Sequence, residues 1–275
     1  MTDDHLSAQG RAIRQFFVTV GEGLRRWTRL DYEGPDTLSP PPALVVANHG
    51  FGGIFDLNAF TVASLVARLT GDLDVPVVVL THQLAWTLGV GRFLEPAGFV
   101  PASREAALDG LAAGGYVLVM PGGDLDAGKS FAHRNEVVWG GRTGFAGIAL
   151  EAGVPIVPVV VAGAGETLLV LSDGQRLAES LRLPSLTRMK TLPISLSLPW
   201  GLSCGVAGML PYLPLPAKMR AAVLEPIEAR SGEGQASLAA RVHEAMSAKL
   251  IDLTVGRVPF IGVRWDDLPG RPVPG

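Results

Sequence analysis

Hydrophobic positions along the chain alternate between short unbroken runs and longer stretches in which apolar and polar residues are mixed. The short runs, rich in β-branched residues, lie at 43–47, 75–80, 99–101, 116–120 and 155–161. The longer stretches that are typical of helices lie at 56–68, 104–113 and 144–152. Unbroken apolar runs are typical of strands buried on both faces. The alternation therefore predicts an α/β fold, in which a mainly parallel central sheet is flanked by helices.

The N-terminal stretch 6–29 has a helical pattern of its own. Its apolar residues recur every three or four positions, at Ile13, Phe16, Phe17, Val20, Leu24 and Trp27. Arginines lie mostly between them, which predicts an N-terminal amphipathic helix. Two interpretations remain open: the helix packs on the domain, or it lies in a membrane interface. Gly21 and Gly23 weaken the helix in either case.

The segment between Lys190 and Lys218 contains no charged residue. Its length would span a bilayer, but prolines at 193, 199, 211, 214 and 216 divide it into pieces too short to cross as a helix. We expect a broken apolar loop that rests on or dips into a membrane, with a buried irregular segment as the alternative. Cys204 lies within this segment, where a buried thiol would be inert. Farther on, 219–229 has the pattern of a strand and 235–250 that of a helix.

We expect three parts: a helix and Pro-rich connector (1–39), an α/β domain (40–255) and a Pro-rich tail (256–275). With 48% hydrophobic and 18% charged residues, the composition favours a lipid or membrane partner. The net charge of −3 argues against a nucleic-acid partner. A single cysteine excludes an internal disulfide and a cysteine-based zinc site, and we expect no metal. The acidic N-terminal stretch lacks the pattern of a secretory signal, so we expect the protein to stay in the cytoplasm.

Residues 43–60 place a histidine and an aspartate on either side of a glycine-rich loop. His49 follows an apolar run, where it is a candidate general base, and Asp56 precedes a helical stretch. A carboxylate that accepts the Nδ1 proton leaves Nε2 for the substrate. The alternatives are a structural histidine and an aspartate that only caps the helix. No Gly-x-Ser-x-Gly elbow supplies a nucleophile, so such a dyad would activate a substrate hydroxyl.

The glycines between the two residues predict a definite geometry. Residues seven apart on a continuous helix lie about 10 Å apart along its axis, too far for a hydrogen bond. We expect Gly50, Gly52 and Gly53 to adopt compact or positive-φ conformations and fold the loop back. Asp56 would then cap the following helix and reach the His49 ring at the same time.

Four stretches resemble, in order and spacing, motifs of the glycerolipid and lysophospholipid acyltransferase superfamily. They are NHGFGGIFD at 48–56, the region 99–123 that ends in MPGG, the region 134–169 that begins RNEVVWGGRTGF, and the apolar, Pro-rich region 198–227. The resemblance covers roughly residues 40 to 230. It is nearest to the monoacylglycerol and diacylglycerol acyltransferase-like branch of that superfamily.

The resemblance implies a glycerol-phosphate acyltransferase-like fold and a role for each matching residue. His49 would be the base that activates an acceptor alcohol for direct attack on an acyl thioester, and Asp56 would orient its ring. The residues implied in substrate binding are Arg104, which would position the acceptor or a phosphate; Pro121, Gly122 and Gly123, which would line the acyl-transfer site; and Arg142 and Phe145, which match an R-x-G-F stretch. We also expect Lys129 and Arg134 to meet phosphates of coenzyme A, with a solvated loop as the alternative.

Two departures from the family pattern bear on the chemistry. The common motif has four residues between histidine and aspartate, whereas six separate His49 from Asp56. Many members also carry a glutamate after the proline of the third motif, where this chain has Gly122 and Gly123. The missing carboxylate favours a neutral alcohol as the acceptor over lysophosphatidic acid.

The resemblance thus predicts transfer of a fatty acyl group from acyl-CoA or acyl carrier protein to a glycerolipid or long-chain alcohol. Acyl-CoA would be a co-substrate, and we expect no further cofactor. The enzyme would lie in the cytoplasm, peripherally on the inner face of a membrane. Two alternatives remain open: a thioester or ester hydrolase, and a catalytically silent lipid-binding protein on the same fold.

Overall fold

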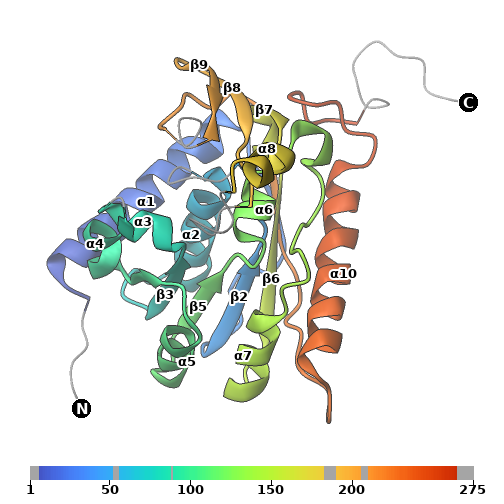
Figure 1. Ribbon diagram of the computed structural model, residues 1–275. Helices are drawn as coiled ribbons and strands as arrows, with labels where there is room; N and C mark the ends of the chain where they lie inside the picture. Colours follow the sequence, from blue (N-terminus) through green and yellow to red (C-terminus); the bar gives the residue numbers. More distant parts are fainter. Residues whose placement is uncertain (1–5, 52–55, 88, 183–189, 206–209, 265–275) are drawn as a thin grey trace, which may run out of the picture.

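The computed structural model describes residues 6–51, 56–87, 89–182, 190–205 and 210–264. Its centre is a seven-stranded sheet in the order β1-β10-β6-β2-β5-β3-β4. Figure 1 labels the neighbouring strands β6, β2, β5 and β3 of this sheet. The strands are β1 (Asp31–Glu33), β2 (Ala43–Ala47), β3 (Val77–Thr81), β4 (Phe99–Pro101), β5 (Tyr116–Val119), β6 (Ile156–Ala162) and β10 (Arg220–Val223). The pairs are parallel except β10 with β6. This confirms the predicted α/β fold with a mainly parallel sheet.

Helices cover both faces of this sheet. On one face lie α1 (Ala8–Trp27) and α2 (Leu57–Thr70), and on the other lie α5 (Arg104–Ala112), α7 (Gly144–Ala152) and α10 (Gln235–Thr254) (Figure 1). Alternate residues of β2 enter the two cores, Val45 on the α2 side and Val46 on the α7 side. Because successive side chains of a strand point to opposite faces, a strand covered twice must be apolar throughout. The bounds of β2, β4 and α7 match those predicted.

Short elements that the apolar pattern did not predict join these layers. They are α3 (Gln83–Thr87), α4 (Val90–Leu94), η1 (Glu95–Ala97), α6 (Gly123–Ala127), η2 (Phe131–His133), η3 (Ala164–Glu166) and α8 (Gln175–Ser180). Each spans at most six residues, too few to show a helical period. The tail expected at 256–275 is described only to residue 264, so the remainder of that prediction lies outside the described residues.

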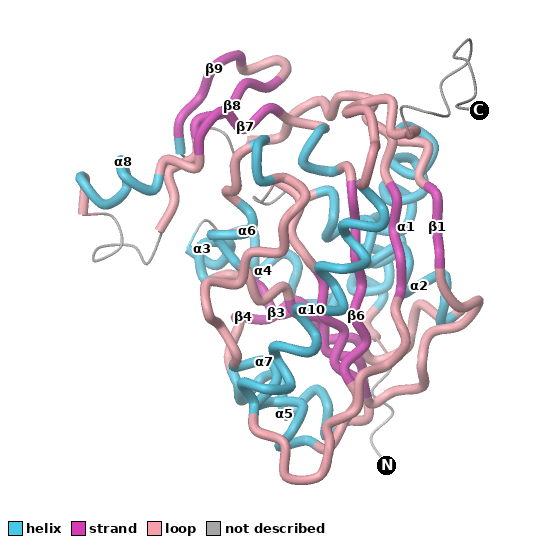
Figure 2. Tube along the Cα trace, turned by 90° about the vertical axis from the view of Figure 1, so that its right-hand side faces the viewer, coloured by secondary structure: helices cyan, strands magenta, loops and turns pink. Residues whose placement is uncertain are grey.

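Part of the uncharged segment forms strands of a second sheet, where a broken loop was expected. Strands β7 (Leu169–Ser172), β8 (Ile194–Ser197) and β9 (Gly201–Cys204) pair antiparallel in that order. Figure 2 shows this small sheet projecting from one end of the body. Cys204, expected to be buried, is exposed on β9. Within the described residues, no helix is both long enough and apolar enough to cross a membrane.

The N-terminal helix packs on the domain, which is the first of the two interpretations. Phe17 stacks on Phe60 of α2, with ring centroids 4.8 Å apart, and lies 5.1 Å from Phe99. Gly21 is buried against Ser64 of α2. Phe16 and Trp27 stay exposed. The apolar stripe of α1 is therefore divided between the core and the surface.

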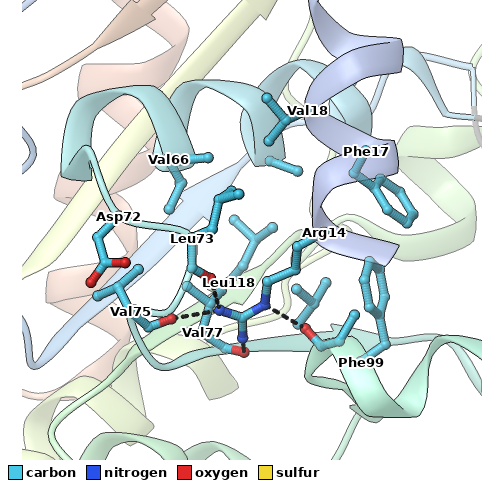
Figure 3. A pocket seen from close by; sticks show the side chains of 14 residues that line it. Arg14, Phe17, Val18, Val66, Asp72, Leu73, Val75, Val77, Phe99 and Leu118 are labelled. Carbon is cyan, nitrogen blue, oxygen red and sulfur yellow. Dashed lines mark hydrogen bonds between the residues drawn. The ribbon is translucent and has the colours of Figure 1, made fainter. Parts of the chain in front are cut away.

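Arg14, one of the arginines of the amphipathic pattern, is a structural residue. Its guanidinium donates to four backbone carbonyls, those of Leu73, Val75, Val77 and Ala97, at 2.7 to 3.2 Å (Figure 3). Burial lowers the pKa of Arg14, and the nearby carboxylates of Asp74 and Asp72 oppose this shift. Five donors on a planar group let one side chain satisfy several carbonyls that would otherwise lack partners.

Gly21 and Gly23 provide a matched test of the α1–α2 contact. A Cβ on Gly21 would lie 2.5 Å from the Ser64 Cβ, whereas a Cβ on Gly23 would have no atom within 4 Å. Gly21→Ala should lower the free energy of unfolding by about 1–3 kcal/mol through overpacking. Gly23→Ala should raise it by about 0.5–1 kcal/mol, because alanine favours the helix. Urea unfolding of the two variants checks this, and equal effects would show that α1 does not pack closely on α2.

Candidate active site

His49 lies two residues beyond the carboxyl end of β2, and its neighbour Asn48 anchors it there. The buried Asn48 amide donates to the carbonyl of Val161 at 3.0 Å and accepts from the Val161 N–H at 2.9 Å. It thereby takes the place that the next peptide of β2 would occupy beside β6. Asn58 of α2 donates to the Asn48 carbonyl at 2.9 Å. The start of the His49 loop is thus fixed to both the sheet and a helix.

Asp56 contacts His49 as predicted. Its Oδ2 lies 2.6 Å from Nδ1 of the ring, while its Oδ1 accepts from the N–H of Asn58 at 2.8 Å and caps α2. The carboxylate is buried, and the His49 side chain is 19% exposed. A carboxylate can only accept at Nδ1, so the neutral ring presents the unprotonated Nε2. Among the described residues, no hydrogen bond occupies that Nε2.

Of the loop glycines for which compact or positive-φ conformations were predicted, the structure describes Gly50. Gly50 does not adopt a positive φ. A Cβ at this position would instead lie 2.7 Å from the Cβ of Ala164, so the absence of a side chain permits close approach. Gly52 and Gly53 lie outside the described residues, as does most of the predicted turn.

A buried ion pair that the sequence analysis missed holds the backbone of His49. Asp126 of α6 accepts the His49 N–H at 2.7 Å and the Val138 N–H at 3.1 Å, and it pairs with Lys129 at 2.6 Å. The Lys129 ammonium also donates to the carbonyls of His49 and Glu136, each at 3.0 Å. Both backbone polar groups of His49 therefore bind one ion pair. The i, i+3 spacing of an acid and a base in DLDAGKS was the available signal.

These contacts contradict the expectation for Lys129. An ammonium group has three donors, and all three are used inside the protein. The side chain is also buried, so it does not meet a phosphate of coenzyme A as placed. The Lys129 ammonium neutralises the buried carboxylate of Asp126, and the ion pair is buried because it links three chain segments.

Pro121, Gly122 and Gly123 follow β5 at the same edge of the sheet as His49, and Arg142 fastens them. Its guanidinium donates to the carbonyls of Pro121 and Gly122 and pairs with Asp124 at 2.8 Å. Gly123 has φ near +49°, and a Cβ there would lie 2.7 Å from the Arg142 Nη1. Arg142 thus holds the glycine turn in place through hydrogen bonds to its backbone.

Three other residues implied in substrate binding have protein partners. Phe145 is buried edge-on to Trp139 at 4.9 Å between ring centroids, so it belongs to the core. Arg134 lies over the Phe131 ring and 3.6 Å from the buried Glu166. Arg104, at the exposed start of α5, forms an ion pair with Glu151 of α7. The structure therefore brings together His49, Asp56 and the 121–123 turn, and turns Phe145 inward.

The small sheet covers one side of the His49 loop. Phe51 is buried against Leu168 and Val170, and its ring meets Tyr212 edge-on at 6.3 Å. Burial raises the pKa of Tyr212.

The cavity of about 60 Å³ in Figure 3 lies elsewhere, between α1, α2 and the β3–β5 strands, and it would hold only a few methylene groups. Within the described residues, no group of three or more His, Cys, Asp or Glu side chains is placed to hold a metal.

Comparison with known proteins shows that this chain is similar to acyltransferases. A family model described as Acyltransferase matches residues 29–162. A chicken (Gallus gallus) protein named DGAT1/2-independent enzyme synthesizing storage lipids is 27% identical over 188 residues, which cover 66% of this chain and 54% of that protein. An uncharacterized Mycobacterium tuberculosis protein is 29% identical over 228 residues, covering 82% and 58%. The chain thus spans a little over half the length of these relatives.

A solved structure is similar over most of the fold. It is the crystal structure of the 1-acyl-sn-glycerophosphate (LPA) acyltransferase PlsC from Thermotoga maritima. The TM-score is 0.55 and the sequence identity 15%, with 90% of this chain and 82% of that chain covered. At this identity the likeness supports the fold alone.

The buried ion pair leads to a stability prediction. Asp126→Asn leaves the Lys129 charge unpaired, and Lys129→Met leaves Asp126 unpaired, so each should cost about 3–5 kcal/mol of unfolding free energy. The double variant removes both charges and should cost less than the sum of the two. Asp124→Asn, on the same helix but paired with a partly exposed arginine, is the matched control and should cost less. Urea unfolding measures all four variants, and strictly additive losses would refute the coupling.

Proposed function

Because the chain belongs to the glycerolipid acyltransferase superfamily, we propose that it transfers a fatty acyl group from acyl-CoA, or from acyl carrier protein, to a lipid hydroxyl. The acceptor would be a glycerolipid or a long-chain alcohol. The observation that carries the proposal is the 2.6 Å contact between His49 Nδ1 and Asp56 Oδ2 at the carboxyl end of β2. In parallel α/β sheets this edge is where ligands usually bind.

The proposed reaction is a direct transfer. His49 Nε2 takes the proton of the acceptor hydroxyl while the oxygen attacks the thioester carbonyl carbon. The tetrahedral intermediate then expels the thiolate, which receives that proton from the imidazolium, so an ester and a free thiol result. Asp56 stabilises the imidazolium that forms between the two steps. No protein nucleophile takes part, and no acyl-enzyme forms.

The surroundings of the dyad favour a neutral acceptor. Lys129, Arg134 and Arg142, three basic residues of the neighbouring loops, are each engaged by a carboxylate or carbonyl of the protein itself. A phosphomonoester carries about two negative charges at neutral pH and would need cations that are not already paired. The name of the chicken relative, an enzyme synthesizing storage lipids, supports the same choice.

The site of action would be a membrane surface on its cytoplasmic side. The proposed acceptor and product are both lipids that partition into a bilayer, while a coenzyme A or carrier-protein donor is water-soluble. An enzyme that joins the two is best placed at the interface, attached peripherally.

The dyad gives the first test of the reaction. His49→Ala should lower transfer by about 10²- to 10⁴-fold, because the general base is lost. Asp56→Asn should also lower it strongly, by disturbing the tautomer, yet it should keep the fold, since asparagine caps a helix as well as aspartate does. Labelled acyl-CoA with neutral and phosphorylated acceptors reports transfer, and released fatty acid reports hydrolysis. Near wild-type turnover of His49→Ala would exclude the mechanism.

Arg104 gives a second test with a matched partner. If Arg104 positions a polar group of a substrate, Arg104→Ala should raise KM several-fold and leave kcat nearly unchanged. Glu151→Ala removes the same ion pair from the other side and should leave KM unaltered. Steady-state kinetics of the two variants separate the roles. Equal effects of both would reduce Arg104 to a residue that fastens α5 to α7.

A further inference from the structure

The small β7–β8–β9 sheet has its polarity reversed. Ser195 of β8 pairs with Ser203 of β9, and Leu196 pairs with Leu202. The serines face inward, with Ser195 fully buried and its hydroxyl 3.2 Å from that of Ser203. The leucines face outward, with 45% of Leu196 and 68% of Leu202 exposed. A sheet with one face in water normally shows the opposite arrangement, so the outer face has the composition of a buried one.

This outer face continues onto neighbouring segments. An isolated bridge joins Leu198 to Leu213, and both side chains are exposed. Trp27, at the end of α1, donates its indole N–H to the carbonyl of Pro214 at 2.9 Å. An apolar groove lies between this end of α1 and the 213–214 segment. We call this continuous surface the leucine face, made up of Leu171, Leu196, Leu198, Trp200, Leu202, Leu213 and Trp27.

We propose that the leucine face docks on a lipid bilayer and inserts its apolar side chains among the acyl chains. The choice of a bilayer rests in part on the proposed lipid substrates. The residues that the structure describes between Lys190 and Lys218 carry no charge that insertion would have to desolvate. The indole N–H groups of the two tryptophans in the leucine face are also satisfied internally: Trp200 donates to the Pro211 carbonyl at 2.5 Å, and Trp27 donates to the Pro214 carbonyl. Such groups enter an apolar medium without losing a hydrogen bond.

The charges at the border favour a bilayer over a second copy of the chain. Arg26 and Arg29 flank Trp27, Lys190 precedes β8, and all three are exposed. Anionic headgroups would complement these cations. A two-fold dimer through the same face would bring like charges toward one another, because each copy contributes the same patch.

Docking in this way would place the site at the membrane. The inner side of the sheet contributes Val170 to the cluster that buries Phe51, two residues after His49. The leucine face and the His49 loop therefore lie on opposite sides of the small sheet. A lipid hydroxyl at the depth of the headgroups would have a short path to His49.

The single cysteine of the chain allows a direct measurement. Cys204 pairs with Ile194 on the same side of the sheet as Leu202 and is exposed. A nitrobenzoxadiazole dye on Cys204 of the full chain should brighten on vesicles of phosphatidylcholine and phosphatidylglycerol, and lipids brominated in their acyl chains should quench it. Leu196→Gln with Leu202→Gln should weaken vesicle binding at least about ten-fold without changing charge. Ile251→Gln, 60% exposed on α10, is the matched control and should bind normally.

Several outcomes would overturn the proposal. The dye could remain exposed to water when the protein is bound to vesicles, the double glutamine variant could bind vesicles as well as the unmodified protein, or the Ile251→Gln control could lose as much vesicle binding as the double variant. A dimer in solution that the double variant converts to a monomer, without vesicle binding, would assign the face to self-association. Circular dichroism verifies that the variants are folded. The assay contains no acyl donor, and His49→Ala should dock like the unmodified protein, so failure of docking and failure of acyl transfer are separately visible.

Discussion

The arrangement of the site depends on one buried ion pair, Asp126 with Lys129. A carboxylate without access to water must find donors for its charge, and an ammonium must find acceptors. Here those partners are the N–H and the C=O of His49, together with backbone groups of Val138 and Glu136. The His49 loop therefore meets two segments near residues 126–138 at one point. The position of the histidine backbone follows from satisfying buried charge.

The orientation of the ring is a separate matter, and a second carboxylate decides it. Asp56 divides its two oxygens between the His49 ring and the first turn of α2, so the helix terminus and the imidazole are fixed by the same group. The Asn48 side chain joins the start of the loop to the Val161 backbone of β6, and Asn58 donates to the Asn48 carbonyl. Position and orientation thus have different determinants. A histidine held in this way would need little rearrangement for the proposed role as a base.

Some polar residues of this chain are buried, and some apolar residues are exposed. Basic residues near the site are used internally, as Lys129 and Arg142 show, while leucines of the small sheet face outward. Neutralised cations leave little attraction for a phosphorylated acceptor, and an outward apolar face leaves a surface suited to lipid. Both features agree with a neutral lipid substrate reached from a membrane.

The sequence by itself determined several of the main elements and the contact between Asp56 and His49. Unbroken apolar runs located β2 and β4, helical spacing located α7, and the loop argument predicted that Asp56 would both cap α2 and reach His49. Those features depend on local patterns. Tertiary structure alone decided which way individual residues face: Lys129 pairs inward, Phe17 and Phe145 join the core, and the 191–217 segment contributes strands that expose leucine. The physical reason is that burial depends on segments far away along the chain, such as the His49 backbone beside Lys129 and α2 beside Phe17, so the local spacing of residues does not predict it.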